Sequence, residues 1–414
     1  MSRSPVLAAA PGPAAVRPAR RLPRSAGFAV IVAIMVLFQA AASAPAPLYV
    51  VYQRLWAFSA GTLTLIFAIF VLALLGTLLV AGQLSDYRGR RPVLLAAIAL
   101  EAGALVLFLL AGNVAMLLAA RAVQGIATGL ALPALGATLV DFNPPHAPGR
   151  AAVVSGVVPV GGLAAGALAC SSLVSFAPDP VHLVWILLLA ALAVALAAVL
   201  ALPEPATRQP GARKSLAPRL GIPGRLRREV VALFPVIVAS WALGGLYLSL
   251  GPSAAVGIFG LTSHFDGGLV VTLLCGTGAV TAYALRGAGS RTVLRASTSL
   301  LAAGTAVTLG GVLTGSLPAA IAGTALAGVG YGASGLAAFG TMARLAGPAD
   351  AAERGGLFAV AYVVAYLAFS LPALAAGYVS IRAGLRDTVA AYSLLVIVIA
   401  AAALAGRELR PVRG

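Results

Sequence analysis

Two charged residues stand inside apolar stretches of this sequence, where charges are rare, and both could take part in proton chemistry. Glu101 lies near the middle of an apolar run over 93–112, and Arg121 lies in the next run, over 114–140. A carboxyl group in apolar surroundings has to be neutral, paired or hydrated, and such a group suits proton binding and release. A hydrogen-bonded structural role for Glu101 is the alternative, and Arg121 could instead reach the surface through its long side chain.

A polar stretch between two apolar runs combines glycines, one acid and several arginines. The acid, Asp86, can form a salt bridge with Arg90 or with a partner in the other half of the chain, and the glycines permit a tight turn and close contact between helices. Asp141 directly follows another apolar run, so we expect it to form a salt bridge at that helix end. The stretch reads Gly82-Gln83-Leu84-Ser85-Asp86-Tyr87-Arg88-Gly89-Arg90-Arg91-Pro92.

Apolar runs make up most of the chain and decide its fold class. Of the 414 residues, 61% are hydrophobic and 9% are charged, a composition that excludes a water-soluble globular domain. A membrane-spanning helix needs about 20 apolar residues, and the alternation typical of a membrane barrel is absent from the sequence. We therefore predict an all-α polytopic membrane protein. Its twelve predicted transmembrane helices are 28–50, 61–82, 93–112, 114–140, 151–175, 181–202, 230–250, 268–285, 293–313, 317–340, 355–380 and 388–405.

The distribution of basic residues predicts the orientation of these helices. All 28 Lys and Arg residues except Arg54, Arg121, Arg382 and Arg386 fall in segments on one side of the membrane. Basic loops stay in the cytoplasm, so both termini are predicted to be cytoplasmic. The net charge of +17 is therefore explained by topology and by contact with anionic membrane lipids. Nucleic acid is not an expected partner, because no aromatic stacking platform accompanies the basic residues.

A polar segment near the middle divides the chain into two halves with a weak internal repeat. Gly125 and Gly129 of the first half match Gly328 and Gly332 of the second. Paired halves of six helices are typical of transporters that alternate access to a central site. We predict a cytoplasmic tail over 1–27, a six-helix bundle over 28–202, a cytoplasmic loop over 203–229, a second six-helix bundle over 230–405 and a cytoplasmic tail over 406–414.

Two stretches of the sequence resemble motifs of the major facilitator superfamily. The stretch over 82–92 resembles the signature loop of that family, although Tyr87 replaces a residue that is usually basic. The run Arg121-Ala122-Val123-Gln124-Gly125 resembles a motif linked to proton transfer in proton-coupled members. The resemblance implies the fold of that family, two pseudo-symmetric six-helix bundles. It also implies a conformational latch on the cytoplasmic side, formed by Gly82, Asp86, Gly89, Arg90 and Arg91.

The resemblance further implies a central substrate cavity, lined chiefly by the first, fourth, seventh and tenth spans. The polar and aromatic residues of the expected cavity include few fixed charges, which suits a neutral or lipophilic solute. For each aromatic residue, packing or anchoring at the bilayer interface is the alternative. The candidates are Gln39, Gln124, Trp241, Tyr247, Tyr331, Tyr362 and Tyr366.

These features favour a transporter over an enzyme. The sequence has no nucleotide-binding loop and no cluster of potential metal ligands, so we expect no cofactor and no metal. We predict proton-coupled export of a lipophilic drug or secondary metabolite by a monomer, with Glu101 and Arg121 coupling transport to protons. A glycine motif of drug antiporters is only partly matched at 157–166, so uptake or downhill passage of a neutral nutrient remains the alternative. The alanine and arginine excess points to a bacterial inner membrane.

Overall fold

The computed structural model consists of helices throughout the part of the chain that it describes. Their order is α1 (Arg24–Ser43), α2 (Pro45–Trp56), α3 (Ala60–Ala81), α4 (Leu84–Arg88), α5 (Arg90–Leu109), α6 (Val114–Asp141), α7 (Arg150–Phe176), α8 (Leu183–Ala201), the short 3₁₀ helix η2 (Gly224–Leu226), α9 (Arg227–Ser249), α10 (Gly251–Phe259), α11 (His264–Ala284), α12 (Ser290–Thr314), α13 (Leu317–Ala346), α14 (Ala351–Ala383) and α15 (Leu385–Ala405).

The description covers residues 23–147, 149–205, 220–288, 290–346 and 351–406. The predicted cytoplasmic tails and much of the predicted central loop therefore lie outside the described residues. Within those residues no strand occurs, as the predicted all-α class requires.

Twelve spans of the described chain are long and apolar enough to cross a membrane, which confirms the predicted number. The first span differs most from its prediction, because it extends over Ala26–Trp56 instead of ending at residue 50. Ala44, between α1 and α2, keeps helical backbone angles of φ −54° and ψ −36°. The helical path therefore continues until Ala57, whose φ of 50° ends it.

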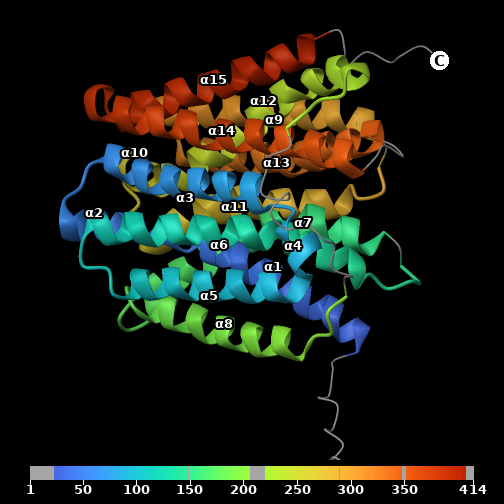
Figure 1. Ribbon diagram of the computed structural model, residues 1–414. Helices are drawn as coiled ribbons and strands as arrows, with labels where there is room; N and C mark the ends of the chain where they lie inside the picture. Colours follow the sequence, from blue (N-terminus) through green and yellow to red (C-terminus); the bar gives the residue numbers. More distant parts are fainter. Residues whose placement is uncertain (1–22, 148, 206–219, 289, 347–350, 407–414) are drawn as a thin grey trace, which may run out of the picture.

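The helices form two bundles that repeat the same packing pattern. In Figure 1 most of the first bundle, α1 to α8, lies in the lower part and most of the second, α9 to α15, in the upper part, with α3 and α11 at middle height. Helix α5 packs against α6 and α8 in the first bundle, and α12 packs against α13 and α15 in the second. Likewise, α1 packs against α7 as α9 packs against α14. The predicted pseudo-symmetry of the two bundles is thus present in the contacts between helices.

The repeated glycines occupy equivalent close contacts in the two bundles. A Cβ atom on Gly125 would lie 2.3 Å from the carbonyl oxygen of Phe70 in α3. A Cβ atom on Gly332 would lie 1.9 Å from the carbonyl oxygen of Gly278 in α11. Both distances are too short for any side chain, so glycine lets these helix backbones approach each other closely.

The two bundles meet along two seams, α3 with α14 and α7 with α11. Small residues make both seams tight. A Cβ atom on Gly377 of α14 would lie 1.8 Å from Oγ1 of Thr64, and one on Gly268 of α11 would lie 2.3 Å from Oγ of Ser171. Thr64 lies near the start of α3, which follows α2, and Gly268 lies near the start of α11, which follows α10. These contacts are therefore at the end of the bundles where Figure 1 shows α2 and α10, on the left. The basic residues predict that this is the outer side.

We predict that Gly377→Val opens the outer part of the α3–α14 seam, because the valine side chain has no space beside Thr64. Thr64 is fully buried, so a cysteine introduced there should react slowly with a membrane-impermeant maleimide. The Gly377→Val variant should accelerate that labelling by about tenfold, equivalent to about 1.4 kcal/mol. Gly103→Val is the matched control, because a Cβ atom on Gly103 meets no atom within 4 Å. Equal labelling rates in both variants would contradict the prediction.

Candidate functional site

Glu101, Gln124 and Arg121 form a buried hydrogen-bonded chain between α5 and α6. Among the described residues, Glu101 and Arg121 are the charged side chains that are buried, with 0% and 2% exposure. Nε2 of Gln124 donates to Oε1 of Glu101 over 2.9 Å, and Nη1 of Arg121 donates to Oε1 of Gln124 over 2.6 Å. The structure therefore brings together the acid and the arginine that the sequence singled out, with the glutamine amide between them.

The guanidinium of Arg121 points into the bundle and does not extend to the surface. Its Nε donates to the hydroxyl of Tyr49 in α2 over 2.6 Å, and its Nη1 also donates to the carbonyl of Ala42 in α1 over 3.1 Å. The ring of Phe70 lies below it, 4.8 Å from Cζ. A charged side chain inside a membrane protein needs such partners to offset the loss of water.

Pro45 explains why a backbone carbonyl of α1, that of Ala41, is free to accept a hydrogen bond from Gln124. In a regular helix the carbonyl of Ala41 would accept from the N–H of residue 45, but Pro45 has no N–H to donate. Nε2 of Gln124 donates to that carbonyl instead, over 3.1 Å. Gln124 thus joins the acid on α5 to the junction of α1 and α2.

Two buried oxygen atoms near the hydrogen bonds of Glu101, Gln124 and Arg121 remain without a partner among the described residues. They are Oε2 of Glu101 and Oγ1 of Thr128, one turn beyond Gln124 on α6. An unpartnered buried oxygen is unfavourable, and for a carboxylate it is much more unfavourable than for a neutral carboxyl group. A proton or a water molecule on Oε2 of Glu101 would remove that cost.

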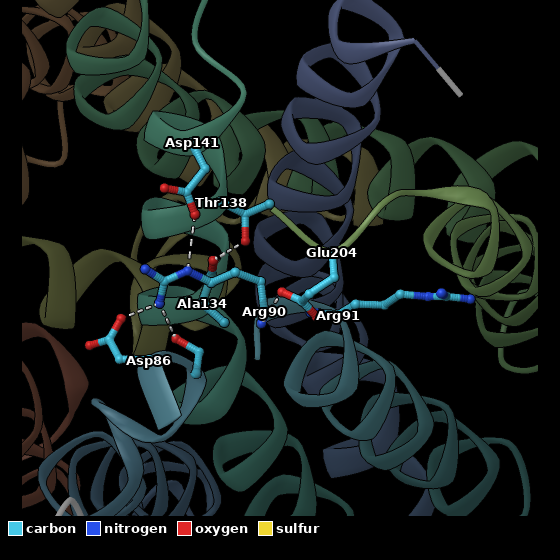
Figure 2. A network of polar contacts seen from close by, with 8 residues as sticks. Asp86, Arg90, Arg91, Ala134, Thr138, Asp141 and Glu204 are labelled. Carbon is cyan, nitrogen blue, oxygen red and sulfur yellow. Dashed lines mark hydrogen bonds and ion pairs between the residues drawn. The ribbon is translucent and has the colours of Figure 1, made fainter. Parts of the chain in front are cut away.

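The predicted latch is a second polar cluster, at the start of α5. Gly89 has a φ of 100°, which a residue with a side chain rarely adopts. This turn directs the side chain of Arg90 between two acids, as Figure 2 shows. Nη1 of Arg90 binds Asp86 and donates to Oγ of Ser85, and its Nε donates to Asp141 over 3.1 Å. The predicted salt bridges of Asp86 and Asp141 are both present, on the same arginine.

Glu204 completes the latch cluster, although the sequence analysis did not select it. Its two carboxylate oxygens accept from the backbone N–H groups of Arg90 and Arg91 over 2.8 and 3.0 Å (Figure 2). These N–H groups are unpaired at a helix N-terminus, where a negative charge is also favourable. The side chain of Arg91 turns away from Asp86 and donates to the carbonyl of Leu200 in α8. The end of the first bundle is therefore fastened to the start of α5.

Aromatic rings of the second bundle gather between α9 and α14. The ring of Trp241 meets those of Tyr366 and Phe369 edge to face, at centroid distances of 4.9 and 5.8 Å. Tyr362 lies one turn before Tyr366, with ring centroids 6.2 Å apart. Phe369 also contacts Phe67 of α3 at 5.1 Å, so this group borders a seam between the bundles.

Tyr331 of α13 also belongs to this group, because its ring packs next to Gly244 of α9, beside the ring of Phe369. A Cβ atom on Gly244 would lie 3.0 Å from the hydroxyl of Tyr331 and 3.1 Å from the ring of Phe369. Glycine at this position therefore leaves the space that the two rings occupy. We call the group the aromatic cluster; it consists of Trp241, Tyr331, Tyr362, Tyr366 and Phe369.

The tyrosine hydroxyls of the aromatic cluster lack hydrogen-bond partners among the described residues. Elsewhere a buried tyrosine hydroxyl is bonded, as in Tyr392, which donates to the carbonyl of Ala242 over 2.8 Å. The hydroxyls of Tyr331, Tyr362 and Tyr366 form no hydrogen bond with any described residue. Each of them would gain a hydrogen bond from a water molecule or a solute that reached it.

The other predicted cavity residues lie apart from the aromatic cluster. Nε2 of Gln39 donates to the carbonyl of Pro159 over 3.0 Å. Tyr247 is buried and shares a hydrogen bond of 2.8 Å with Thr324, while Gln124 is enclosed in the chain with Glu101. In the described part of the protein, no three His, Cys, Asp or Glu side chains could hold a metal ion together.

Comparisons with known proteins agree with this architecture. The family model described as Major Facilitator Superfamily matches residues 28–371. The crystal structure of the human organic anion transporter MFSD10 (TETRAN) is similar, with a TM-score of 0.68 and 19% sequence identity. The match covers 92% of this chain and 100% of that chain, and at this identity it shows a shared fold. No curated protein matches this sequence.

We predict that Glu204→Ala destabilises the start of α5. Loss of a side chain that caps a helix N-terminus costs about 1 kcal/mol, and here two backbone N–H groups lose their acceptor. The melting temperature of the purified variant should fall by a few degrees, and Glu204→Gln should show a smaller loss. Glu229→Ala is the matched control, because Glu229 is exposed in the first turn of α9. Equal melting temperatures for the two alanine variants would refute the capping role.

Proposed function

Because the chain belongs to the major facilitator superfamily and crosses the membrane many times, we propose that it exports a lipophilic solute in exchange for protons. Members of this family transport small molecules. In the alternating-access mechanism the two bundles rock against each other, so that a central site opens to one side of the membrane at a time. The proposed setting is a bacterial inner membrane, with the protein acting as a monomer. The proposed solute is a drug or a secondary metabolite.

The buried chain of Glu101, Gln124 and Arg121 is the single observation that supports proton coupling most strongly. A neutral Glu101 avoids a buried negative charge, whereas an ionised Glu101 gains from Arg121 through the shared Gln124. Both protonation states are therefore tolerable, which a proton carrier requires. The unpartnered Oε2 of Glu101 is the atom on which the proton would be held.

The hydrogen bonds of Gln124 and Arg121 with α1 and α2 suggest how a proton on Glu101 could change the conformation. Ionisation of Glu101 would draw the amide of Gln124 and the guanidinium of Arg121 toward the acid. Arg121 holds Tyr49, and α2, which carries Tyr49, contacts α10 and α11 of the second bundle at the predicted outer side. A proton on Glu101 would thus be linked to the separation of the two bundles at that side.

The aromatic cluster supports a lipophilic solute. Its rings offer apolar faces, and its three free hydroxyls and the indole of Trp241 offer a few polar contacts for orientation. The five residues of the cluster carry no formal charge, so a strongly charged solute would lose its hydration there without compensation. Gln39 on the facing bundle is the proposed polar contact from the first span, and Tyr247, which bonds Thr324, is a further proposed contact on α9.

Uptake or downhill passage of a neutral nutrient is the second candidate function. The uncharged aromatic cluster with free hydroxyls is also compatible with a sugar, whose faces stack on aromatic rings. The two functions differ in the direction of solute flux and in proton exchange. The contacts of the latch cluster (Gly82, Asp86, Gly89, Arg90 and Arg91) lie within the first bundle in this structure. The cluster would have to gain contacts with the second bundle to hold the cytoplasmic side closed, in either case.

We predict that Glu101→Gln abolishes proton exchange. Purified protein in liposomes that contain a pH-sensitive dye should move protons when lipophilic compounds are added. The Gln variant keeps the size and the hydrogen bond to Gln124, but it cannot release a proton. Glu229→Gln is the matched control and should retain full exchange, because Glu229 is exposed. Exchange that survives in Glu101→Gln would place the proton elsewhere, and solute flux without protons would favour the second candidate function.

We predict that Tyr366→Phe weakens solute binding without loss of stability. The hydroxyl of Tyr366 has no partner among the described residues, so its removal should leave the melting temperature unchanged and raise the KM about fivefold, for about 1 kcal/mol of lost hydrogen bonding. Tyr392→Phe is the matched control, because its hydroxyl bonds Ala242. That variant should melt at a lower temperature with an unchanged KM. The reverse pattern would refute the role of the aromatic cluster in binding.

A further inference from the structure

Matching positions of α6 and α13 bind a tyrosine in the first span of their own bundle. The alignment of the repeated glycines pairs Arg121 of α6 with Thr324 of α13. Nε of Arg121 donates to the hydroxyl of Tyr49 over 2.6 Å, and the hydroxyl of Thr324 shares a hydrogen bond of 2.8 Å with that of Tyr247. Each bundle therefore joins its first span to its fourth through a tyrosine hydroxyl.

The hydrogen bond in the second bundle is independent of charge. In the first bundle the arginine is linked to Glu101 through Gln124, whereas Ala327 stands at the matching place of the second bundle. Thr324 and Tyr247 are uncharged, and each is 5% exposed. The bond between these two hydroxyls therefore keeps its partners whether Glu101 carries a proton or not.

This bond lies on the two helix faces that carry members of the aromatic cluster. On α9, Trp241, Gly244 and Tyr247 follow one another at intervals of three residues, so they share one face. On α13, Thr324 and Tyr331 are two helical turns apart and also share a face. The two faces meet at Gly244, where a Cβ atom would lie 3.0 Å from the hydroxyl of Tyr331.

The bond also fixes how far α9 is shifted along α13. Small residues let membrane helices approach each other, but a hydrogen bond between two side chains holds one register. Farther along the same contact, Oγ of Ser240 reaches the carbonyl of Tyr331 only over 3.5 Å. Trp241 packs against Phe339 of α13, with ring centroids 6.4 Å apart, so a shift of α13 would change the surroundings of the indole.

We propose that Thr324 is a positioning residue for solute selection. By holding the hydroxyl of Tyr247, it sets the spacing between Trp241 on α9 and Tyr331 on α13, and this spacing limits the size of the neutral solute that the aromatic cluster accepts. The selection of size rests on the proposed role of the aromatic cluster in binding, but it is independent of the direction of transport and of proton coupling.

Fluorine NMR of the purified full-length protein without solute tests the positioning. The chain has three tryptophans, which can be labelled as 5-fluorotryptophan, and the Trp241 resonance is the one that Trp241→Phe removes. Thr324→Val removes the hydroxyl at nearly constant volume, so it should shift or broaden the Trp241 resonance and leave the other two unchanged. Thr324→Ser should restore the parent spectrum. Tyr247→Phe should cause the same change as Thr324→Val, and the double variant should add nothing.

Thr305→Val is the matched control for this experiment. Thr305 is another buried threonine of the second bundle, but its hydroxyl donates to the carbonyl of Leu301 in its own helix over 2.6 Å. The control should leave the Trp241 resonance unchanged. A parent-like spectrum in Thr324→Val, or the same change in Thr305→Val, would overturn the positioning role.

Binding of a graded series of solutes tests the selection of size. The probes are the methyl, ethyl, propyl and butyl esters of 4-hydroxybenzoate, which are neutral and differ only in length. The parent should prefer one ester when Kd is measured by titration of the Trp241 resonance, and Thr324→Val should reduce that preference several-fold because the spacing is no longer fixed. Thr305→Val should keep the preference of the parent.

The outcomes separate this inference from the proposed function. An unchanged preference in Thr324→Val would overturn the selection of size by this residue, even if the esters bind. A Trp241 resonance of the parent that none of the esters moves would refute the aromatic cluster as the solute site, and with it the selection of size. The spectra without solute would still decide whether Thr324 positions the cluster.

Discussion

The side-chain amide of Gln124 is the contact on which the interior of the first bundle depends. Its oxygen accepts from Arg121, and its nitrogen donates to Glu101 and to the carbonyl of Ala41. One side chain on α6 thereby bonds both buried charged residues and the carbonyl that Pro45 leaves free. Without this amide the acid and the arginine would lie buried with fewer partners, which is strongly unfavourable in a membrane interior.

The two bundles share a packing pattern, but they divide the chemistry between them. The first bundle holds the buried charges and the latch cluster, whereas the equivalent of Asp86 in the second bundle is replaced by Arg286. The second bundle holds the aromatic cluster instead. Because the fold is repeated, the two bundles meet along two matched seams. Because their side chains have diverged, the buried charged groups lie in the first bundle and the uncharged aromatic rings lie in the second.

The sequence alone predicted the features that depend on composition and on local spacing. Hydropathy identified all twelve spans, and the matching glycine pairs identified the internal repeat. The helices that these glycines contact, α3 and α11, became known only from the structure. The extension of the first span to Trp56 was missed, because Gln53 and Arg54 lower the local hydropathy although the helix continues. The role of Glu204 could not be predicted, since its partners are backbone N–H groups 113 and 114 positions away, and such groups leave no trace in the sequence.

The hydrogen bonds between Glu204 and the start of α5 also affect when the first bundle can fold during synthesis. Every partner of the latch cluster lies in the first 204 residues, so this cluster can form before the second bundle leaves the ribosome. Chains fold from the N-terminal domain onward during synthesis. By contrast, α3 and α7 lack their seam partners, α14 and α11, at that stage. The first bundle would therefore enter the membrane with its predicted cytoplasmic face completed, and two of its helix faces would remain uncovered until the second bundle is made.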